Sequence, residues 1–527
     1  MESEEDCTIQ LQLRHVRYKL GSVRKDARRQ LFCHFMKSRN FRTEVLSKVL
    51  MDKNLFPSRE DIFYFLKFAF KHHSLIIIQL LRVNNVNIHE LIFENGYSAL
   101  HYLAELDVSK ERNFKAKGGS MKLIRLFVND SEKSHIDEHG YSYFHGACMA
   151  GDVHTVRRFI SEGIEVNFDS WKCSPLHIAA QYRQKDVVQL LLENGANPNQ
   201  QDRKRSTPLH ALAWMCLCDC CSHCTFCDYR KPVEAIVEML VKKKANIEAR
   251  NEHGDTPLQS AVCHFDFQLV KSLLKHGASL NSLNEERIFS QNFESIELKN
   301  YPLTWNIIEV MHLLQSAGYR LNFKTRLLML KCWIKVRGND TEHIIPFFDE
   351  EDEKEYHRHQ AIVFHIYMHE KYGFYYKRDA VDYLRVQKED LKWRVFQEDI
   401  DHEIIERIRN CRKQTTMLNE VKLNDDVSLY QLCKMNYSEG YSILKNMKDW
   451  QLHIPEGLEH CPMHLIVKRH VGNILIRRHL ELFAADLFTT DDCQLDLPYL
   501  VSLKIAENMS DEDLLRLCEQ IEEANLE

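Results

Sequence analysis

A short apolar phrase recurs along this chain at nearly constant spacing, and it constrains the fold more than any other feature. The clearest copy reads Ser-Pro-Leu-His-Ile-Ala-Ala at residues 174–180. Its relatives are separated by 44, 32, 33 and 49 residues, measured between His101, His145, His177, His210 and Gln259. Repeated units of this length stack on their neighbours and bury one continuous core. The spacing predicts an elongated helical array, in which the two longer intervals carry loop insertions.

Each unit follows the same local pattern, best seen in residues 169–201. Ser174 is expected to cap a short helix that starts at Pro175, because proline suits the first helical position. A second helix follows with an apolar stripe, and Gly195 ends it in a left-handed conformation. Similar stripes precede Gly163 and Gly277, whereas Lys244 stands where the corresponding glycine is expected. The pattern therefore predicts pairs of helices separated by turns.

The period near 33 residues and the phrase around His177 resemble the ankyrin repeat, whose signature is T-P-L-H-x-A. About six or seven copies are expected between Arg59 and Asn322, with atypical copies at the ends. The resemblance implies that turn tips and short helices bind a target protein. The residues at those positions are Glu138, Tyr141, Trp171, Tyr182, Arg203, Lys204, Arg205, Trp214, His253 and Asp255. For Trp171, Tyr182 and Trp214, packing beneath an adjacent loop is the alternative.

Composition and the N-terminal sequence limit the function classes. The 527 residues are 44% hydrophobic and 28% charged with a net charge of −6, which fits a folded chain and disfavours nucleic acid as a partner. The acidic start does not resemble a signal peptide, and no apolar stretch is long enough to cross a membrane. We expect a cytoplasmic or nuclear protein without a membrane partner. Its 17 cysteines are then expected to be reduced thiols or metal ligands.

A cysteine-rich insertion, residues 214–230, interrupts the array. Its overlapping C-x2-C pairs could hold a structural zinc ion through Cys218, Cys221, Cys224 and Cys227. Four ligands within ten residues strain the backbone, however, so a loop of free thiols is the alternative, and an iron–sulfur cluster is a third. His365 and His369 lie one helical turn apart, but a packed or solvated helix explains them without metal. No cofactor other than this zinc is expected.

The C-terminal part contains a second pattern. Apolar residues recur every four positions, on one face of a predicted helix, at Leu497, Val501, Ile505 and Met509. Ser510 and Asp513 form a capping pair for a following helix. The order Leu-Pro, apolar residues, then Ser-Asp-x-Asp-Leu looks like the start of an F-box. Together with the repeats and the segment Ser428-Leu429-Tyr430, it resembles the PRANC domain of pox-type ankyrin proteins and their insect relatives.

This second resemblance implies docking on the Skp-type adaptor of a cullin ubiquitin ligase. The docking residues that it implies are Leu497, Pro498, Val501, Ile505, Met509, Asp513 and Leu514. The third helix of a complete F-box, with its cysteine and tryptophan pattern, does not follow. The alternative is therefore a helical hairpin that seals the end of the C-terminal domain.

These observations predict an all-α protein: an ankyrin-repeat α-solenoid followed by a helical PRANC or F-box-like domain. The expected parts are an N-terminal helical segment (1–58), the array (59–322), a helical connector (323–415) and the C-terminal domain (416–527). The predicted function is a non-catalytic adaptor that captures a target protein and recruits a ubiquitin ligase. The alternatives are a scaffold that sequesters a signalling protein, such as a Rel/NF-κB-type factor, and a zinc enzyme or nucleic-acid binder built on the insertion.

Overall fold

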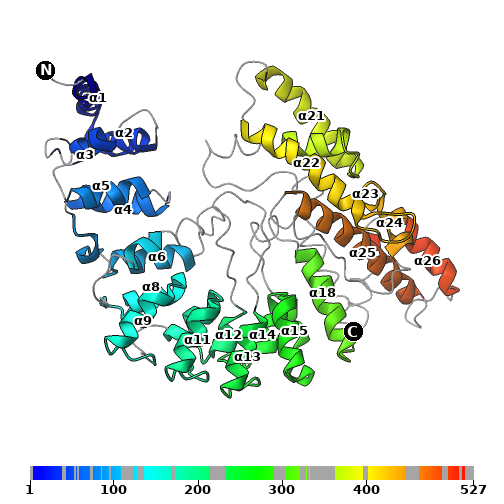
Figure 1. Ribbon diagram of the computed structural model, residues 1–527. Coiled ribbons are helices and arrows are strands. Elements are labelled where there is room, and N and C mark those ends of the chain that lie inside the picture. The colour runs from blue at the N-terminus through cyan, green and yellow to red at the C-terminus, as the bar shows by residue number, and fades with distance from the viewer. Residues whose placement is uncertain are drawn as a thin grey trace. The chain divides into compact units, whose positions relative to one another are not determined.

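The computed structural model describes residues 4–37, 43–50, 52, 55, 59–71, 75–84, 86–93, 96–108, 123–128, 136–167, 173–213, 233–289, 303–320, 328, 332, 362–395, 402–444, 462–488, 497–509, 513, 514 and 516. Within these ranges the secondary structure is helical, and the extended contacts are isolated β-bridges (Figure 1). The chain divides into two compact units. The first comprises Met1–Ala211, Asp219–His223 and Lys242–Ala245, and the second comprises Leu212–Cys218, Cys224–Val241 and Asn246–Glu527.

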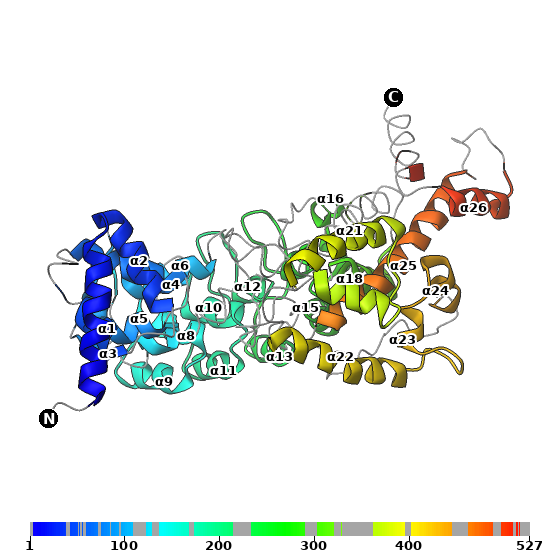
Figure 2. The ribbon, with the colours of Figure 1, turned by 90° about the horizontal axis from the view of Figure 1, so that it is seen from above.

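The first unit is a succession of short helices. Its elements are α1 (Glu4–Gly21), α2 (Lys25–Lys37), α3 (Thr43–Leu50), α4 (Arg59–Lys71), α5 (Leu75–Val83), η1 (Ile88–Glu90), α6 (Ala99–Val108), α8 (Tyr143–Ala150), α9 (Val153–Ser161), α10 (Pro175–Gln181), α11 (Lys185–Glu193) and α12 (Pro208–Ala211). Helix α10 packs between α8 and α12, and α11 packs on α9 (Figure 2). Equivalent helices of successive repeats therefore lie side by side.

The helix pairs form for the local reasons that the sequence indicates, with one correction. Gly195 ends α11 with φ +86°, and Lys244 adopts the same left-handed conformation with φ +65°. Ser174 stands at the N-cap of α10, but its hydroxyl does not cap the backbone. The hydroxyl is instead hydrogen-bonded to His177 Nδ1 at 2.8 Å. His177 Nε2 then donates to the carbonyl of Ser206 at 2.8 Å, which ties this repeat to the next turn.

The second unit begins with repeat-type helices and continues into longer ones. Its elements are α13 (Glu234–Lys242, at the division between the units), α14 (Pro257–Cys263), α15 (Phe267–Lys275), η2 (Leu280–Ser282), α16 (Glu285–Ile288), α18 (Leu303–Ser316), a helix over 362–370, α21 (Arg378–Val395), α22 (His402–Glu420), α23 (Leu429–Leu432), α24 (Tyr437–Leu444), α25 (Pro462–Phe488) and α26 (Tyr499–Asn508). Helix α25 packs against α18, α24 and α26, and its contact with α26 is seen in Figure 2.

The turn before α23 repeats the design of the turns between repeats. Lys422 and Ser428 form an antiparallel bridge, as Ile136 and Ser142 do before α8. Ser428 then forms a capping box with Gln431, as Ser142 does with His145 at the start of α8. A repeat-like turn and helix start thus occur inside the C-terminal region, a likeness that the sequence analysis missed.

No helix among the described residues is both long and apolar enough to cross a membrane.

Candidate functional site

The turns between repeats present rigid tips. We define four tips as residues 93–97, 137–141, 202–206 and 251–255. In each tip the first N–H donates to the carbonyl of the last residue, at 2.9–3.0 Å, and the fourth N–H donates back to the first carbonyl, also at 2.9–3.0 Å. These paired hydrogen bonds fix the backbone of the three tips that are described throughout, 137–141, 202–206 and 251–255, so their side chains project from a defined loop.

Asx side chains strengthen three of these tips. Asp202 Oδ1 accepts from the N–H groups of Lys204 and Ser206, at 2.8 and 2.7 Å. Asp137 and Asn251 make the equivalent pairs of hydrogen bonds in their own tips, at 2.9–3.0 Å. An Asx residue that satisfies two loop N–H groups holds a turn without helix or sheet. The tips are therefore built to keep one shape.

The predicted partner-binding residues divide by exposure. Those that lie exposed on the tips are Glu138, Arg203, Lys204, Arg205 and His253. Trp171, Trp214 and the four cysteines at 218, 221, 224 and 227 lie outside the described residues.

Three predicted partner contacts are buried: the expectation of exposure is wrong for Tyr141 and Asp255, whereas the burial of Tyr182 agrees with the packing alternative. Tyr141 is 2% exposed, because its ring stacks between the rings of His101 and His145, with centroids 4.8 and 5.5 Å away. Tyr182 is buried where α10 ends. Asp255 is buried beside Arg287, with Nη2 2.9 Å from Oδ2. These three side chains stabilise the repeats, and the exposed residues beside them on the tips are the ones available to a partner.

A buried histidine–aspartate pair links two repeats in the first unit. His101 Nδ1 lies 2.6 Å from Asp137 Oδ2, and both side chains are buried. Burial alone would raise the pKa of Asp137, but the hydrogen bonds and charge of His101, with the backbone N–H groups of Ser98 and Tyr141, lower it overall. Burial also lowers the pKa of the nearby His145 to about 3, so that imidazole is neutral at pH 7. This network is structural, since it joins the 98–101 segment to the tip of the next repeat.

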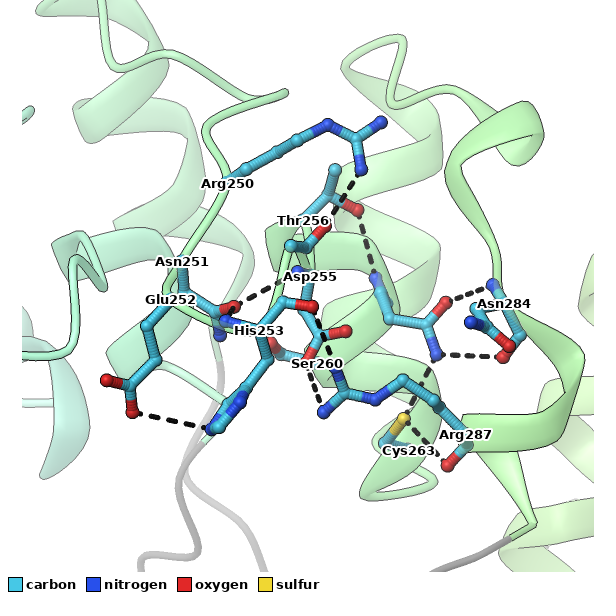
Figure 3. A network of polar contacts seen from close by, with 12 residues as sticks. Arg250, Asn251, Glu252, His253, Asp255, Thr256, Ser260, Cys263, Asn284 and Arg287 are labelled. Carbon is cyan, nitrogen blue, oxygen red and sulfur yellow. Dashed lines mark hydrogen bonds and ion pairs between the residues drawn. The ribbon is translucent and has the colours of Figure 1, made fainter.

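The tip at 251–255 is braced by the following turn (Figure 3). Arg287 donates through Nη1 to the carbonyl of His253 at 2.9 Å, in addition to its ion pair with Asp255. Gln259 occupies the position of the repeat histidine. Its Oε1 accepts from the N–H of Asn284 at 2.6 Å, and its Nε2 donates to the Asn284 carbonyl at 3.2 Å. Glutamine thus takes over the link to the next turn that histidine makes in the 174–206 repeat.

The candidate docking face at the C-terminal end is carried by α26. Leu500, Val501 and Ile505 are 77%, 44% and 39% exposed, and Tyr499 is 41% exposed. On the opposite side, Ser502 and Ala506 are buried, and small residues of this kind let α26 approach α25 closely. We call the exposed residues Tyr499, Leu500, Val501 and Ile505 the apolar face of α26. The sequence pattern found Val501 and Ile505 but missed Tyr499 and Leu500, whose apolar character was the available signal.

The other predicted docking residues differ in exposure. Pro498 and Asp513 are exposed, and Leu497 and Met509 are half-buried. Leu514 is fully buried, so the expectation that it contributes to an exposed docking face is wrong. Ser510, the predicted helix cap, lies outside the described residues. The exposed part of the predicted face is therefore centred on α26 and not on the segment after it.

Arg477 of α25 contacts the backbone carbonyls at the C-terminal end of α26. Arg477 Nη2 donates to the carbonyls of Met509, Ala506 and Glu507, at 2.7, 3.2 and 3.4 Å. Its Nε donates to Glu481 Oε1 at 2.8 Å. A cation at a helix C-terminus is favourable, because the last carbonyls carry partial negative charge. Arg477 therefore fixes the position of the apolar face without being part of it.

The described residues contain no group of three or more histidine, cysteine and acidic side chains placed to hold a metal. His365 Nδ1 is hydrogen-bonded to the Tyr376 hydroxyl at 2.8 Å, and His369 Nδ1 to the Phe374 carbonyl at 3.2 Å. Burial lowers the pKa of His365 to about 3. These contacts fit the packed-helix interpretation of the two histidines.

Comparison with known proteins identifies the repeats. Residues 113–202 match the family model for ankyrin repeats in three copies, and residues 253–285 match the model for a single ankyrin repeat.

Similar proteins include an ankyrin repeat protein of fowlpox virus, FPV031, 26% identical over 178 residues, which are 33% of this chain and 46% of that protein. Mouse Rabankyrin-5 is 30% identical over 26% of this chain and 12% of its own length. Human B-cell lymphoma 3 protein is 28% identical over 28% of this chain and 31% of its own length. The matched region thus spans less than half of each relative.

Proposed function

We propose that this chain, which contains ankyrin repeats, is a non-catalytic adaptor that captures a target protein and delivers it to a ubiquitin ligase. Ankyrin repeats indicate a protein-binding role. The rigid tips supply exposed side chains for that role, and the ligase would be recruited through the apolar face of α26. Catalysis would then belong to the recruited partners.

The observation that carries the proposal is the exposure of the apolar face. A helix normally buries its apolar side chains, and adjacent exposed ones mark interaction sites. Leu500, Val501 and Ile505 are exposed on α26 although the opposite side of the helix is packed on α25. The segment that contains them is the one that looks like the start of an F-box. A Skp-type adaptor is therefore the partner that we propose for this face.

Co-purification tests the proposal. The double variant Val501→Asp, Ile505→Asp places two charges on the apolar face, and we expect it to lose the Skp-type adaptor and the cullin that co-purify with the wild-type chain. Val386→Asp is the matched control, because Val386 is 59% exposed on the separate helix α21. The control variant should keep both partners.

Two results would contradict the proposal. The first is equal recovery of adaptor and cullin with the wild-type chain and the double variant. The second is their absence from the wild-type purification. If the target protein were still bound in either case, sequestration of that target, for example of a Rel/NF-κB-type factor, would become the preferred function. Circular dichroism of each variant checks that its helical content is unchanged.

A further inference from the structure

The four tips share the same paired backbone hydrogen bonds, and one tip differs from the others at the fourth position. The fourth residue, whose N–H closes the turn, is glycine in three tips: Gly96, Gly140 and Gly254, with φ of +79°, +84° and +77°. In the tip at 202–206 the same position is Arg205, with φ +57°. An L-residue with a Cβ is disfavoured in this left-handed region, whereas glycine is not. The chain therefore accepts backbone strain at this tip that its other tips avoid.

Packing does not explain the arginine. Arg205 is exposed, and a Cβ built on the equivalent Gly254 would meet no atom within 4 Å, whereas one built on Gly96 would lie 2.6 Å from Glu138 Oε2. The Arg205 side chain forms no hydrogen bond or ion pair with the part of the chain that the structure describes, and the same holds for Arg203 and Lys204. Strain without a packing gain also occurs at functional positions, and at this tip it coincides with a cluster of exposed cations.

The charge of this tip is also distinct. Arg203, Lys204 and Arg205 are consecutive and exposed, and we call them the basic tip. The other fully described tips carry a glutamate and a histidine at the second and third positions, Glu138–His139 and Glu252–His253. Three cations on a fixed turn match a short run of carboxylates, because guanidinium groups bind carboxylates through paired hydrogen bonds. The net charge of −6 argues against a general affinity for polyanions.

We propose that the basic tip binds an acidic segment of the protein that the repeats capture, with Arg205 as the central contact. This inference rests on the proposed role of the repeats in protein capture and adds the chemistry of the partner. The Asp202 hydrogen bonds hold the loop before binding, so little loop entropy is lost when the ligand arrives. The left-handed backbone at Arg205 lowers the stability of the fold, and the Arg205 side chain raises the affinity for the acidic segment.

The test measures binding and stability on the same full-length variants. The probe is a fluorescent hexaglutamate peptide, with hexaglutamine as the uncharged control. Arg205→Gly should weaken hexaglutamate binding about tenfold, the loss expected for one charged contact. The same change should raise the melting temperature, because glycine relieves the strain. Binding should also weaken as salt is added.

Lys244→Gly is the matched control. Lys244 is also basic, exposed and left-handed, with φ +65°, but it follows helix α13 and does not lie on a tip. Its replacement should raise the melting temperature and leave hexaglutamate binding unchanged. If Arg205→Gly binds hexaglutamate as the wild type does, the proposal is overturned. Tighter, Arg205-dependent binding of a single-stranded oligothymidine would overturn it too, in favour of nucleic acid.

This experiment is separate from the test of ligase recruitment. The double variant Val501→Asp, Ile505→Asp should bind hexaglutamate as tightly as the wild type, because α26 does not contribute to the basic tip. If the double variant loses the adaptor and still binds hexaglutamate, the result agrees with both proposals. If Arg205→Gly recovers the adaptor and also binds hexaglutamate as tightly as the wild type, only the proposal for the basic tip is refuted.

Discussion

Replacing Arg477 with alanine should release the C-terminal end of α26 from α25. The side chain is 16% exposed and reaches three carbonyls, of which Met509 O is the nearest at 2.7 Å. One Nη2 group has two hydrogens, so about two of these contacts are made at a time. A hydrogen bond to a charged group contributes about 1.5–3 kcal/mol. Because the freed carbonyls can be hydrated, we expect a net loss near 2 kcal/mol.

Hydrogen exchange followed by mass spectrometry measures this loss directly. A change of about 2 kcal/mol in local opening corresponds to roughly 30-fold faster exchange of the α26 amides. Exchange in α10 and α11, in the first unit, should not change. Recruitment of the adaptor should weaken as well, since the apolar face would no longer be held in place.

Two further variants distinguish the effect of the Arg477–carbonyl hydrogen bonds from the effect of a positive charge alone. Arg477→Lys keeps the cation but loses the planar fork, so its exchange rate should lie between those of the wild type and the alanine variant. Arg478 pairs with the side chains of Glu481 and Glu507 and with none of the three carbonyls. Arg478→Ala should therefore have a smaller effect. If Arg477→Ala exchanged within twofold of wild type, or Arg478→Ala accelerated exchange equally, the proposed role of Arg477 would be wrong.

Three other changes probe the repeats and the insertion. Because the pKa of Asp137 is lowered in the folded protein, its pairing with His101 stabilises the fold above pH 3.8, the ordinary aspartate value, and this stability is lost as the pH falls through the lower folded pKa. Urea unfolding should therefore show that Asp137→Asn is less stable than the wild type at pH 7. The stability difference between the two proteins should shrink below pH 3.8. Gly146→Ala should lower the melting temperature, because the added Cβ would lie 2.7 Å from Leu100 Cδ2 in a buried contact; an unchanged melting temperature would show that the neighbouring side chain moves aside freely. If the insertion 214–230 holds zinc, elemental analysis of the purified chain should find about one ion per chain. The ion should be absent when the four C-x2-C cysteines are replaced by serine. No metal in either sample would favour free thiols.

The repeat architecture was predictable because its signals are local. Helix pairs, their apolar stripes and the left-handed residue at Gly195 each follow from a few neighbouring residues, and the spacing near 33 residues shows that the unit recurs. The comparisons confirm ankyrin repeats, and the structure confirms helices throughout the described ranges. The four-residue spacing of Val501 and Ile505 likewise places both on one helix face without any tertiary information.

Exposure and long-range contacts were decided only by the tertiary structure. Tyr141 sits on a tip in the sequence pattern, but the neighbouring histidine rings bury it, and Asp255 is turned toward Arg287. Arg477 reaches carbonyls about thirty residues further along the chain, a contact that no local pattern encodes. Sequence periodicity fixes which residues share a face of one helix, whereas the packing of a second element decides whether that face meets protein or water.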